Sequence, residues 1–514
     1  MTTSNRMPLP AVIPAPVSLE RPKDAEPFEL GPGARIVAVG TAAEEVAGYL
    51  AQLLRPATGS APEVVQHDAR DGDIVLALED DGSGDESYRL DVDARGIRLI
   101  APAAAGLFFG VQTLRQLLPV ELEASDGPVP VTVPAVRITD APRFAYRGVM
   151  LDVARHFLTV EEVERLIDEV ALLKVNHLHL HLTDDQGWRV AIDAYPALTG
   201  IGASTSVDGR GGGHYSKADY ARIVAHAAAR HLTVVPEIDL PGHTHAALTA
   251  VPELNPDGVA PAPYEGVEVG FSGLDPHSPA TWTFVERVLG EVAAMTPGPY
   301  LHLGGDETLS MGDDDYLAFV ARASAIAAGT GKAVIGWHEL GRSRELPAGT
   351  IGQYWSFTTP RDDSAERTRA FVEQGGRVIL SPADVAYLDI SYPDGVDGPE
   401  GRPLGQDWAD GPNSLADSYG WDPERIVPGL DESDLLGIEA PLWTETVTTL
   451  AEAEWLLFPR LAAVAEIAWS PATAARDLAG FDLRLDALRA RLAAMGVACH
   501  GSEPAPHRGI GWAA

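Results

Sequence analysis

The sequence predicts an α/β protein built on a (β/α)8 TIM barrel, preceded by a small α+β domain. From residue 143 to about residue 500, short apolar segments of strand type alternate with longer segments of helix type. This alternation predicts parallel strands joined by helices, and eight such strands favour a closed barrel over an open sheet. Polar and aromatic residues follow the strand segments, which is where barrel enzymes carry their chemistry.

Length and composition restrict the kind of protein. A chain of 514 residues is too long for one modest domain. Its 38 Lys and Arg against 74 Asp and Glu give a net charge of −36, which argues against nucleic acid or an anionic membrane as a partner. Cys499 is the single cysteine, so an intrachain disulfide and a cysteine-based metal site are excluded. With no signal-peptide pattern or membrane span, we expect a soluble protein, cytoplasmic or secreted with its leader absent from this chain.

The first part of the chain predicts the small α+β domain at residues 31–142, after a proline-rich, extended segment at residues 1–30. The predicted strands are 34–39, 73–78, 88–92 and 96–100, and the predicted helices are 42–54 and 103–118. The last two strands are expected to form a hairpin around residues 93–95. Four prolines in residues 126–142 predict a linker to the next domain.

The second part, residues 143–500, supplies the barrel. The predicted strands are 147–153, 176–182, 233–238, 300–303, 332–337, 350–355, 377–380 and 435–440. Thr159 and Glu162 form a capping-box signature before an amphipathic helix. Further helices are expected at 217–230 and 478–495, and residues 501–514 are expected to be a C-terminal tail.

The fourth barrel strand leads into the pair of acids that we take as the candidate catalytic centre. Gly304 and Gly305 allow a sharp turn, and Asp306 and Glu307 follow at the end of the strand. Two adjacent acids do not both ionise easily in a dry site. A protonated Glu307 beside an ionised Asp306 is typical of a glycosidic acid catalyst and its helper. A solvated pair at a helix N-terminus is the alternative interpretation.

Charged and aromatic residues follow the other barrel strands as well. They are Arg155, His156, Asp184, Asp185, Asp239, His243, Trp337, Trp355, Tyr387, Asp389, Trp443 and Glu445. Indoles cover the apolar face of a pyranose and charged groups bind its hydroxyls, so this ring of residues indicates a sugar site. Each tryptophan could instead be a core residue, but their shared place at strand ends favours the site.

Three histidines, His177, His179 and His181, alternate along the second barrel strand and therefore share one face. Such a face could bind zinc. We expect a layer of hydrogen-bonded histidines inside the barrel instead, because no supporting motif such as H-E-x-x-H is present. We expect no metal and no cofactor. The absence of a G-x-S-x-G elbow removes the serine-hydrolase alternative.

Five segments in order resemble the β-N-acetylhexosaminidases of glycoside hydrolase family 20. The segments are 152–157 (DVARHF), 179–188 (HLHLTDDQGW), 236–243 (PEIDLPGH), 302–307 (HLGGDE) and 441–445 (PLWTE). The order and spacing match through residues 143–500, and residues 106–117 resemble the helix that closes the family's N-terminal domain. The resemblance implies a TIM barrel and hydrolysis of N-acetylhexosaminides without a cofactor.

The resemblance also implies residue roles at the matching positions. Glu307 would be the general acid/base, and Asp306 would hold the N–H of the substrate's 2-acetamido group. The substrate-binding residues would be Arg155, Asp184, Trp337, Trp355, Tyr387, Asp389, Trp443 and Glu445. Asp184, Asp239 and His243 would form a supporting network behind the acid.

Individual tasks within the substrate-binding set follow from the same resemblance. The three tryptophans would box the N-acetyl group, and Tyr387 would donate to its oxygen. Arg155 and Glu445 would bind ring hydroxyls at the non-reducing end, and Asp389 would reach the primary hydroxyl.

The expected activity is therefore exo-acting and retaining, with the substrate's own acetamide as nucleophile. Its substrates would be oligosaccharides or glycoconjugates that end in N-acetylglucosamine or N-acetylgalactosamine, as in chitin or glycan degradation. Three alternatives stay open: a non-catalytic sugar-binding protein on this fold, a disaccharide-releasing hexosaminidase, and a retaining glycosidase with a carboxylate nucleophile. Adjacent acids poorly suit the last, which needs its two carboxyls about 5–5.5 Å apart on opposite sides of the anomeric carbon.

Overall fold

The computed structural model of the chain describes residues 9–23, 25–31, 33–124, 128–474 and 477–502. Most of the predicted C-terminal tail, residues 503–514, and the start of the predicted extended segment, residues 1–8, lie outside the described residues. The chain forms two compact units. The first comprises Met1–Arg143, Leu172–Lys174 and Ala465–Ala514, and the second comprises Phe144–Ala171 and Val175–Val464. The domain bounds that we predicted from the sequence stay a prediction.

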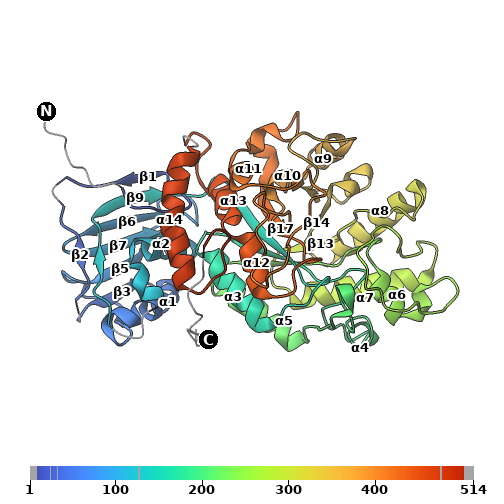
Figure 1. Cartoon of the computed structure of the whole chain (residues 1–514), viewed down its shortest axis with the longest axis horizontal. Coiled ribbons are helices and arrows are strands. Elements are labelled where there is room, and N and C mark those ends of the chain that lie inside the picture. The colour runs from blue at the N-terminus through green and yellow to red at the C-terminus, as the bar shows by residue number, and fades with distance from the viewer. Residues whose placement is uncertain (1–8, 24, 32, 125–127, 475–476, 503–514) are drawn as a thin grey trace. The chain divides into compact units, whose positions relative to one another are not determined.

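The first unit is built on a seven-stranded mixed sheet with the strand order β1-β9-β6-β7-β5-β3-β4 (Figure 1). Its strands are β1 (Ser18–Glu20), β3 (Arg35–Val39), β4 (Glu63–Val65), β5 (Ile74–Leu78), β6 (Tyr88–Asp93), β7 (Gly96–Ala101) and β9 (Val136–Asp140). A small second sheet pairs β2 (Phe28–Glu29) with β8 (Thr132–Val133). Helices α1 (Thr41–Thr58) and α2 (Ala104–Leu117) pack on the large sheet, and η1 (Val120–Glu123) follows α2. The predicted hairpin is confirmed, because β6 and β7 pair antiparallel across residues 93–96.

The prediction of a plain linker at residues 126–142 was wrong. Residues 126 and 127 lie outside the described residues, but β9 occupies the end of the segment and pairs with both β1 and β6. Its side chains alternate between buried and exposed, as in a strand that covers a core on one face. Pro134 and Pro142 stand on either side of β9 and therefore remove no hydrogen bond from the strand itself. Because β1 pairs with β9, residues 18–20 are also a strand rather than a free extended segment.

The second unit is a closed barrel of eight parallel strands, which confirms the predicted fold class. The strands are β10 (Tyr146–Asp152), β11 (His177–His181), β12 (Thr233–Glu237), β13 (Tyr300–His302), β14 (Ala333–Trp337), β15 (Ile351–Tyr354), β16 (Val378–Leu380) and β17 (Leu435–Leu442). The barrel closes where β10 pairs with β17. All strands run in the same direction, so their carboxyl ends meet at one mouth.

Helices alternate with these strands, as the sequence predicts. From residue 144 onward the helices are α3 (Val160–Ala171), α4 (Ala197–Gly200), α5 (Lys217–Ala228), α6 (His245–Ala250), α7 (Pro279–Met295), α8 (Asp313–Gly329), α9 (Ser364–Glu373), α10 (Ala383–Ala386), α11 (Leu415–Tyr419), α12 (Leu450–Leu457), α13 (Arg460–Trp469) and α14 (Leu478–Ala494). Shorter 3-10 helices are η2 (Val207–Gly209), η3 (Pro252–Leu254), η4 (His338–Arg342), η5 (Pro423–Arg425) and η6 (Glu432–Asp434). The predicted capping box at α3 is present, because Glu162 Oε2 accepts from the Thr159 N–H at 2.7 Å and Thr159 Oγ1 from the Glu162 N–H at 3.4 Å.

The interior of the barrel is layered, and the middle layer is polar. The layer near the strand starts is apolar and contains Tyr146, Val235, Ile335, Ile351, Ile379 and Leu436. Further along the strands a fully buried polar layer follows, made of His179, Glu237, His302, Gln353 and Glu439. Branched aliphatic residues usually fill this position in TIM barrels. A polar layer must satisfy its own hydrogen bonds, so it positions side chains more strictly than an apolar one.

No helix among the described residues is long and apolar enough to cross a membrane.

Candidate active site

The turn after β13 brings Asp306 and Glu307 to the mouth of the barrel. Gly304 and Gly305 have φ angles of 64° and 99°, in the left-handed region that favours glycine. A Cβ on Gly304 would lie 1.9 Å from Asp239 Oδ1, so the backbone approaches this carboxylate as closely as only glycine permits. The Gly305 N–H donates to the same Asp239 oxygen at 3.0 Å. Asp239 therefore fixes the turn that carries the two acids.

His243 faces both acids. Its Nε2 atom lies 3.5 Å from Glu307 Oε2 and 3.8 Å from Asp306 Oδ2. The Glu307 side chain is 34% exposed, whereas that of Asp306 is 12% exposed. Both carboxylates thus lie near His243, and Glu307 is the more exposed of the two.

The electrostatics of Asp306 differ from our expectation. Burial raises the pKa of Asp306, and the charges of Glu307 and Glu339 raise it further. The charge of His243 lowers it, and the resulting pKa is about 7. Sequence reasoning assigned the proton of the pair to Glu307 and the charge to Asp306. In the structure Asp306 is the more buried acid, so the unliganded site favours a proton on Asp306 below about pH 7.

Neighbouring protein groups contact both carboxylate oxygens of Asp184. Arg155 Nη2 lies 2.9 Å from Asp184 Oδ2, and His181 Nε2 lies 2.7 Å from the same oxygen. The other oxygen, Oδ1, lies 3.3 Å from His243 Nδ1 and accepts from the Asp185 N–H at 2.6 Å. Burial would raise the pKa of Asp184, but these cations hold it well below its ordinary value. With both oxygens occupied by the protein, Asp184 suits the supporting role better than direct contact with substrate.

The predicted aromatic residues come together. Trp337, Tyr387 and Trp443 share one buried cluster with Met150, Ala383, Ile390 and Ala409, and Trp355 packs against it. The ring centroids of Trp337 and Trp443 are 6.0 Å apart, and those of Tyr387 and Trp443 are 6.4 Å apart. Three indoles and a phenol at one mouth can surround a small apolar group such as a methyl and leave one hydroxyl to orient it.

Arg155 and residues after β17 form a further part of the site. The Arg155 guanidinium lies over the Trp443 ring at 4.8 Å, and β10 and β17 are neighbours, so Arg155 meets Glu445 electrostatically. Burial raises the pKa of Glu445, with the Arg155 charge opposing it. Burial and the nearby Glu445 charge raise the pKa of Asp389 well above its ordinary value. This group places one cation and two carboxyls close together where a ligand's hydroxyls could bind.

Sequence reasoning missed three residues of the site. Glu339, in η4, accepts from Trp355 Nε1 at 2.9 Å, and burial raises its pKa to about 7. Trp408 is 42% exposed, and its ring centroid lies 5.6 Å from that of Tyr387 and 6.1 Å from that of Trp355. Glu237 holds Trp337, because its Oε1 accepts from Trp337 Nε1 at 3.0 Å. Glu237 and Glu339 lie next to residues that we singled out, whereas nothing in the sequence marks Trp408.

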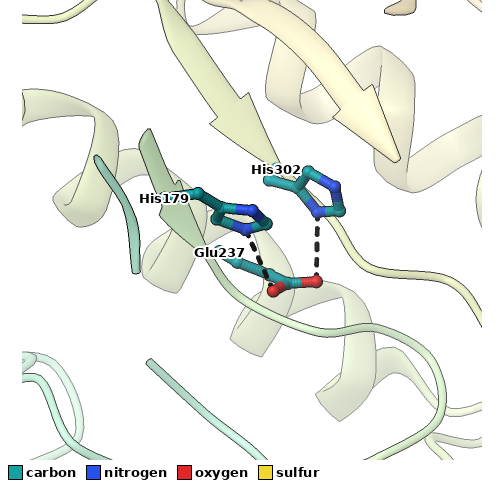
Figure 2. A group of neighbouring side chains, drawn as sticks. All are labelled: His179, Glu237 and His302. Atoms are coloured by element: carbon teal, nitrogen blue, oxygen red, sulfur yellow. Dashed lines mark ion pairs between the residues drawn. The ribbon is translucent and has the colours of Figure 1, made fainter. Parts of the chain in front are cut away.

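The histidines of β11 do not converge on one point. His177 Nδ1 lies 2.6 Å from Asn176 Oδ1, whereas His179 and His181 contact carboxylates. Figure 2 shows another group, His179, Glu237 and His302, whose potential ligand atoms lie within 4.8 Å of one another. Burial would lower the pKa of His179, but the charges of Glu439 and Glu237 raise it to about 9. The imidazolium balances these carboxylates itself, and the absence of a metal requirement stays a prediction.

Family models and relatives show which proteins this chain is similar to. The family model "Glycosyl hydrolase family 20, catalytic domain" matches residues 144–472, and "Glycosyl hydrolase family 20, domain 2" matches residues 9–141. A beta-N-acetylhexosaminidase of Cellulomonas fimi is 44% identical over 468 residues, which cover 90% of each chain.

Solved structures give the same result. The beta-N-acetylhexosaminidase of Streptomyces coelicolor A3(2) has a TM-score of 0.91 and 47% identity, over 98% of this chain and 99% of that one. A mutant beta-hexosaminidase of Streptomyces plicatus in complex with its product GlcNAc has a TM-score of 0.90 and 46% identity, over 98% of each chain.

Proposed function

The chain belongs to glycosyl hydrolase family 20 and is a β-N-acetylhexosaminidase, and from this premise we propose that it removes terminal β-linked N-acetylhexosamine by substrate-assisted, retaining catalysis. In this mechanism the carbonyl oxygen of the substrate's 2-acetamido group attacks C1. The bond from C1 to the glycosidic oxygen breaks, and Glu307 gives its proton to that oxygen. Water then attacks C1 of the cyclic intermediate, the bond from C1 to the acetamide oxygen breaks, and Glu307 takes a proton from the water. This second displacement restores the original anomeric configuration.

The observation that carries the proposal is the common contact of Asp306 and Glu307 with one atom, His243 Nε2, at 3.8 and 3.5 Å. A carboxylate nucleophile and a carboxylic acid must stand on opposite sides of the anomeric carbon. Asp306 and Glu307 are consecutive residues of one turn, so they reach opposite sides of a single carbon poorly. The pair therefore suits one acid/base and one stabiliser of an acetamide that does the attack.

Asp306 is the stabiliser in this scheme. Ionised, it accepts the acetamido N–H and offsets the positive charge that develops on the cyclic intermediate. Its burial makes that interaction strong, because water does not screen the charge well. The same burial makes ionisation of the free enzyme harder, so substrate binding and loss of the Asp306 proton are coupled.

The aromatic cluster orients the acetamide. Trp337, Trp355 and Trp443 surround its methyl group, and Tyr387 donates its hydroxyl to the carbonyl oxygen. Well-oriented intramolecular reactions save about 7–11 kcal/mol of barrier, so the box contributes by holding the acetamide in the attack geometry. No cofactor or metal takes part in any step.

At the far side of the sugar, Arg155 and Glu445 bind ring hydroxyls and Asp389 binds the primary hydroxyl. The substrates are oligosaccharides or glycoconjugates with N-acetylglucosamine or N-acetylgalactosamine at the non-reducing end. Relatives support this class, since the Streptomyces plicatus enzyme is described with GlcNAc as its product.

One assay tests the proposal. We expect the chain to release chromophore from an aryl N-acetyl-β-glucosaminide and to leave the matching aryl β-glucoside nearly intact, because only the first carries the nucleophile. A thiazoline mimic of the cyclic intermediate should inhibit strongly. Comparable turnover of both glycosides contradicts the substrate-assisted mechanism, and turnover of neither favours a sugar-binding protein.

A further inference from the structure

Glu237 occupies a central place in the buried polar layer of the barrel. Its Oε2 lies 2.5 Å from His181 Nδ1 and 3.1 Å from His179 Nε2. Its Oε1 accepts from Trp337 Nε1 at 3.0 Å and lies 3.1 Å from His302 Nδ1. Figure 2 shows one oxygen of the Glu237 carboxylate facing each of the imidazoles of His179 and His302. The side chain has no exposed surface, so it reaches no substrate directly.

One arm from Glu237 leads to the acid. His181 bridges Glu237 to Asp184, with its Nε2 atom 2.7 Å from Asp184 Oδ2. Asp184 in turn meets His243, which faces Glu307. Imidazoles and carboxylates thus alternate from the barrel interior to the proposed proton donor.

The other arm leads to the acetamide box. Trp337 has a single polar atom, its indole N–H, and that atom is bound to Glu237. The ring belongs to the aromatic cluster that also contains Tyr387 and Trp443. The rotation of this indole is therefore set by the position of the Glu237 carboxylate.

The charge of Glu237 suits this double task. Burial would raise the pKa of Glu237, but the charges of His181 and His179 hold it well below its ordinary value. An ionised carboxylate only accepts hydrogen bonds, and it can accept several at once. A neutral amide would turn donor N–H groups toward the imidazoles on one side, so it could not hold both arms.

We propose that Glu237 is a positioning residue that couples the acetamide box to the acid, holding Trp337 with one oxygen and the His181–Asp184–His243 chain with the other. This inference rests on the proposed function of the same site. A shift of Glu237 then misplaces the nucleophile and the proton donor together. Residue 239, in the same segment, acts differently, because Asp239 holds the backbone of the Gly304–Gly305 turn.

The first test compares Glu237→Gln with a matched control, Glu439→Gln. Both carboxylates are fully buried and both contact His179. The other contacts of Glu439 are to Tyr146 and Gln353, which belong to neither arm. We expect Glu237→Gln to lower kcat/KM by up to about 100-fold, with a higher KM and with a larger kcat loss on poor leaving groups than on activated aryl ones. Glu439→Gln should lower the midpoint of thermal unfolding, without a higher KM and without a larger kcat loss on poor leaving groups.

The second test is a double-mutant cycle that keeps Glu237 in place, in case its substitution prevents folding. Trp337→Phe removes the indole N–H and His181→Gln removes the bridging imidazole, each breaking one arm. If Glu237 couples the arms, the double variant should deviate from the product of the single effects on kcat/KM by at least about threefold. Folding of each variant is checked by thermal unfolding.

The outcomes separate the two proposals. An inactive wild-type chain on the aryl N-acetyl-β-glucosaminide overturns the proposed function and this coupling with it. An active wild type with additive single effects, or with equal kinetic losses in Glu237→Gln and Glu439→Gln, overturns the coupling alone. Two results together support the coupling. The double-mutant cycle is non-additive, and Glu237→Gln shows both a higher KM and a larger kcat loss on poor leaving groups.

Discussion

Gly148 on β10 and Glu439 on β17 face each other where the barrel closes, and Gly148 leaves the space that the Glu439 side chain fills. A Cβ on Gly148 would lie 2.5 Å from Glu439 Oε2 and 2.7 Å from Tyr146 Cε1. Glu439 is one of the two carboxylates that contact His179, at 2.8 Å, so the absence of a side chain at Gly148 makes room for the polar layer. A strand glycine inside a barrel is thus explained by close approach of a neighbouring side chain.

The first prediction follows from this contact. Gly148→Ala should lower the free energy of unfolding by about 1–3 kcal/mol, because the methyl group forces the buried carboxylate off its partners. The measurement is denaturant-induced unfolding. Gly290→Ala is the control: Gly290 lies in helix α7 with nothing within 4 Å of the added Cβ, so that change should be neutral or stabilising. Equal effects of the two substitutions would contradict the packing argument.

The second prediction concerns the acid. Glu307→Gln should keep the fold, because this side chain is one-third exposed, and should keep substrate binding. It should lower kcat about 10²–10⁴-fold on glycosides with poor leaving groups, which need a proton. Activated aryl glycosides should lose less. A small, equal loss on both substrate types, measured by initial rates, would remove Glu307 from the acid role.

The third prediction concerns Asp306. Asp306→Asn should damage kcat more than KM, because the lost charge is needed only as the cationic intermediate forms. Since burial raises the pKa of Asp306 to about 7, kcat/KM of the wild type should fall as pH drops through that region, and Asp306→Asn should lack this limb. The charged side chains that act on the pKa of Asp306 are His243, Glu307, Glu339 and Glu237. Isolation of a covalent sugar on any carboxylate would contradict the whole scheme.

The fourth prediction concerns stability and pH. His179 has a pKa of about 9 in the folded chain, above the ordinary 6.5, so the folded state binds this proton more tightly than the unfolded state. This contribution is complete below about pH 6.5 and is lost as pH rises toward about 9. The midpoint of thermal unfolding should therefore fall across this range. In His179→Gln the midpoint should fall less over the same pH range. An equal fall in the variant and the wild type would mean that His179 is neutral in the folded chain.

Much of the fold was predictable because local pattern and tertiary structure agree. Segments such as 233–238 combine β-branched residues with flanking turn or helix signals, and the observed strand differs by one residue. Strand β9 was missed because the prolines around it are typical of a linker. In the structure Pro134 and Pro142 only flank the strand. Strand β13, with three residues, was found through the Gly304–Gly305 break rather than through its length.

The site was predictable where chemistry follows a strand end and unpredictable where it depends on burial. Trp337 and Asp306 stand at strand ends, so the barrel rule locates them. Which acid of the pair carries a raised pKa depends on their relative burial, which spacing does not reveal. Trp408 reaches the aromatic residues from the segment between α10 and α11, so only the three-dimensional structure identifies it.

The last prediction concerns the mode of attack: the chain should release one terminal sugar at a time. Arg155 is buried against Trp443 and Asp184, and Glu445 follows the neighbouring strand, with Gln406 Nε2 donating to its Oε2 at 3.0 Å. These groups can bind the hydroxyls farthest from the scissile bond by charge-assisted hydrogen bonds.

An internal sugar would carry a further glycosidic bond in place of one of those hydroxyls. The hydrogen bonds from that hydroxyl to these buried groups would then be lost, at a cost of about 1–3 kcal/mol for each donor or acceptor left unsatisfied. The measurement is product analysis on a chito-oligomer labelled at its reducing end. Stepwise shortening by one unit, with free N-acetylglucosamine as the early product, agrees with this role of Arg155 and Glu445. Early release of disaccharide or of internal fragments would mean that the site stays open beyond the non-reducing sugar. Arg155 would then bind something other than a hydroxyl of a terminal sugar.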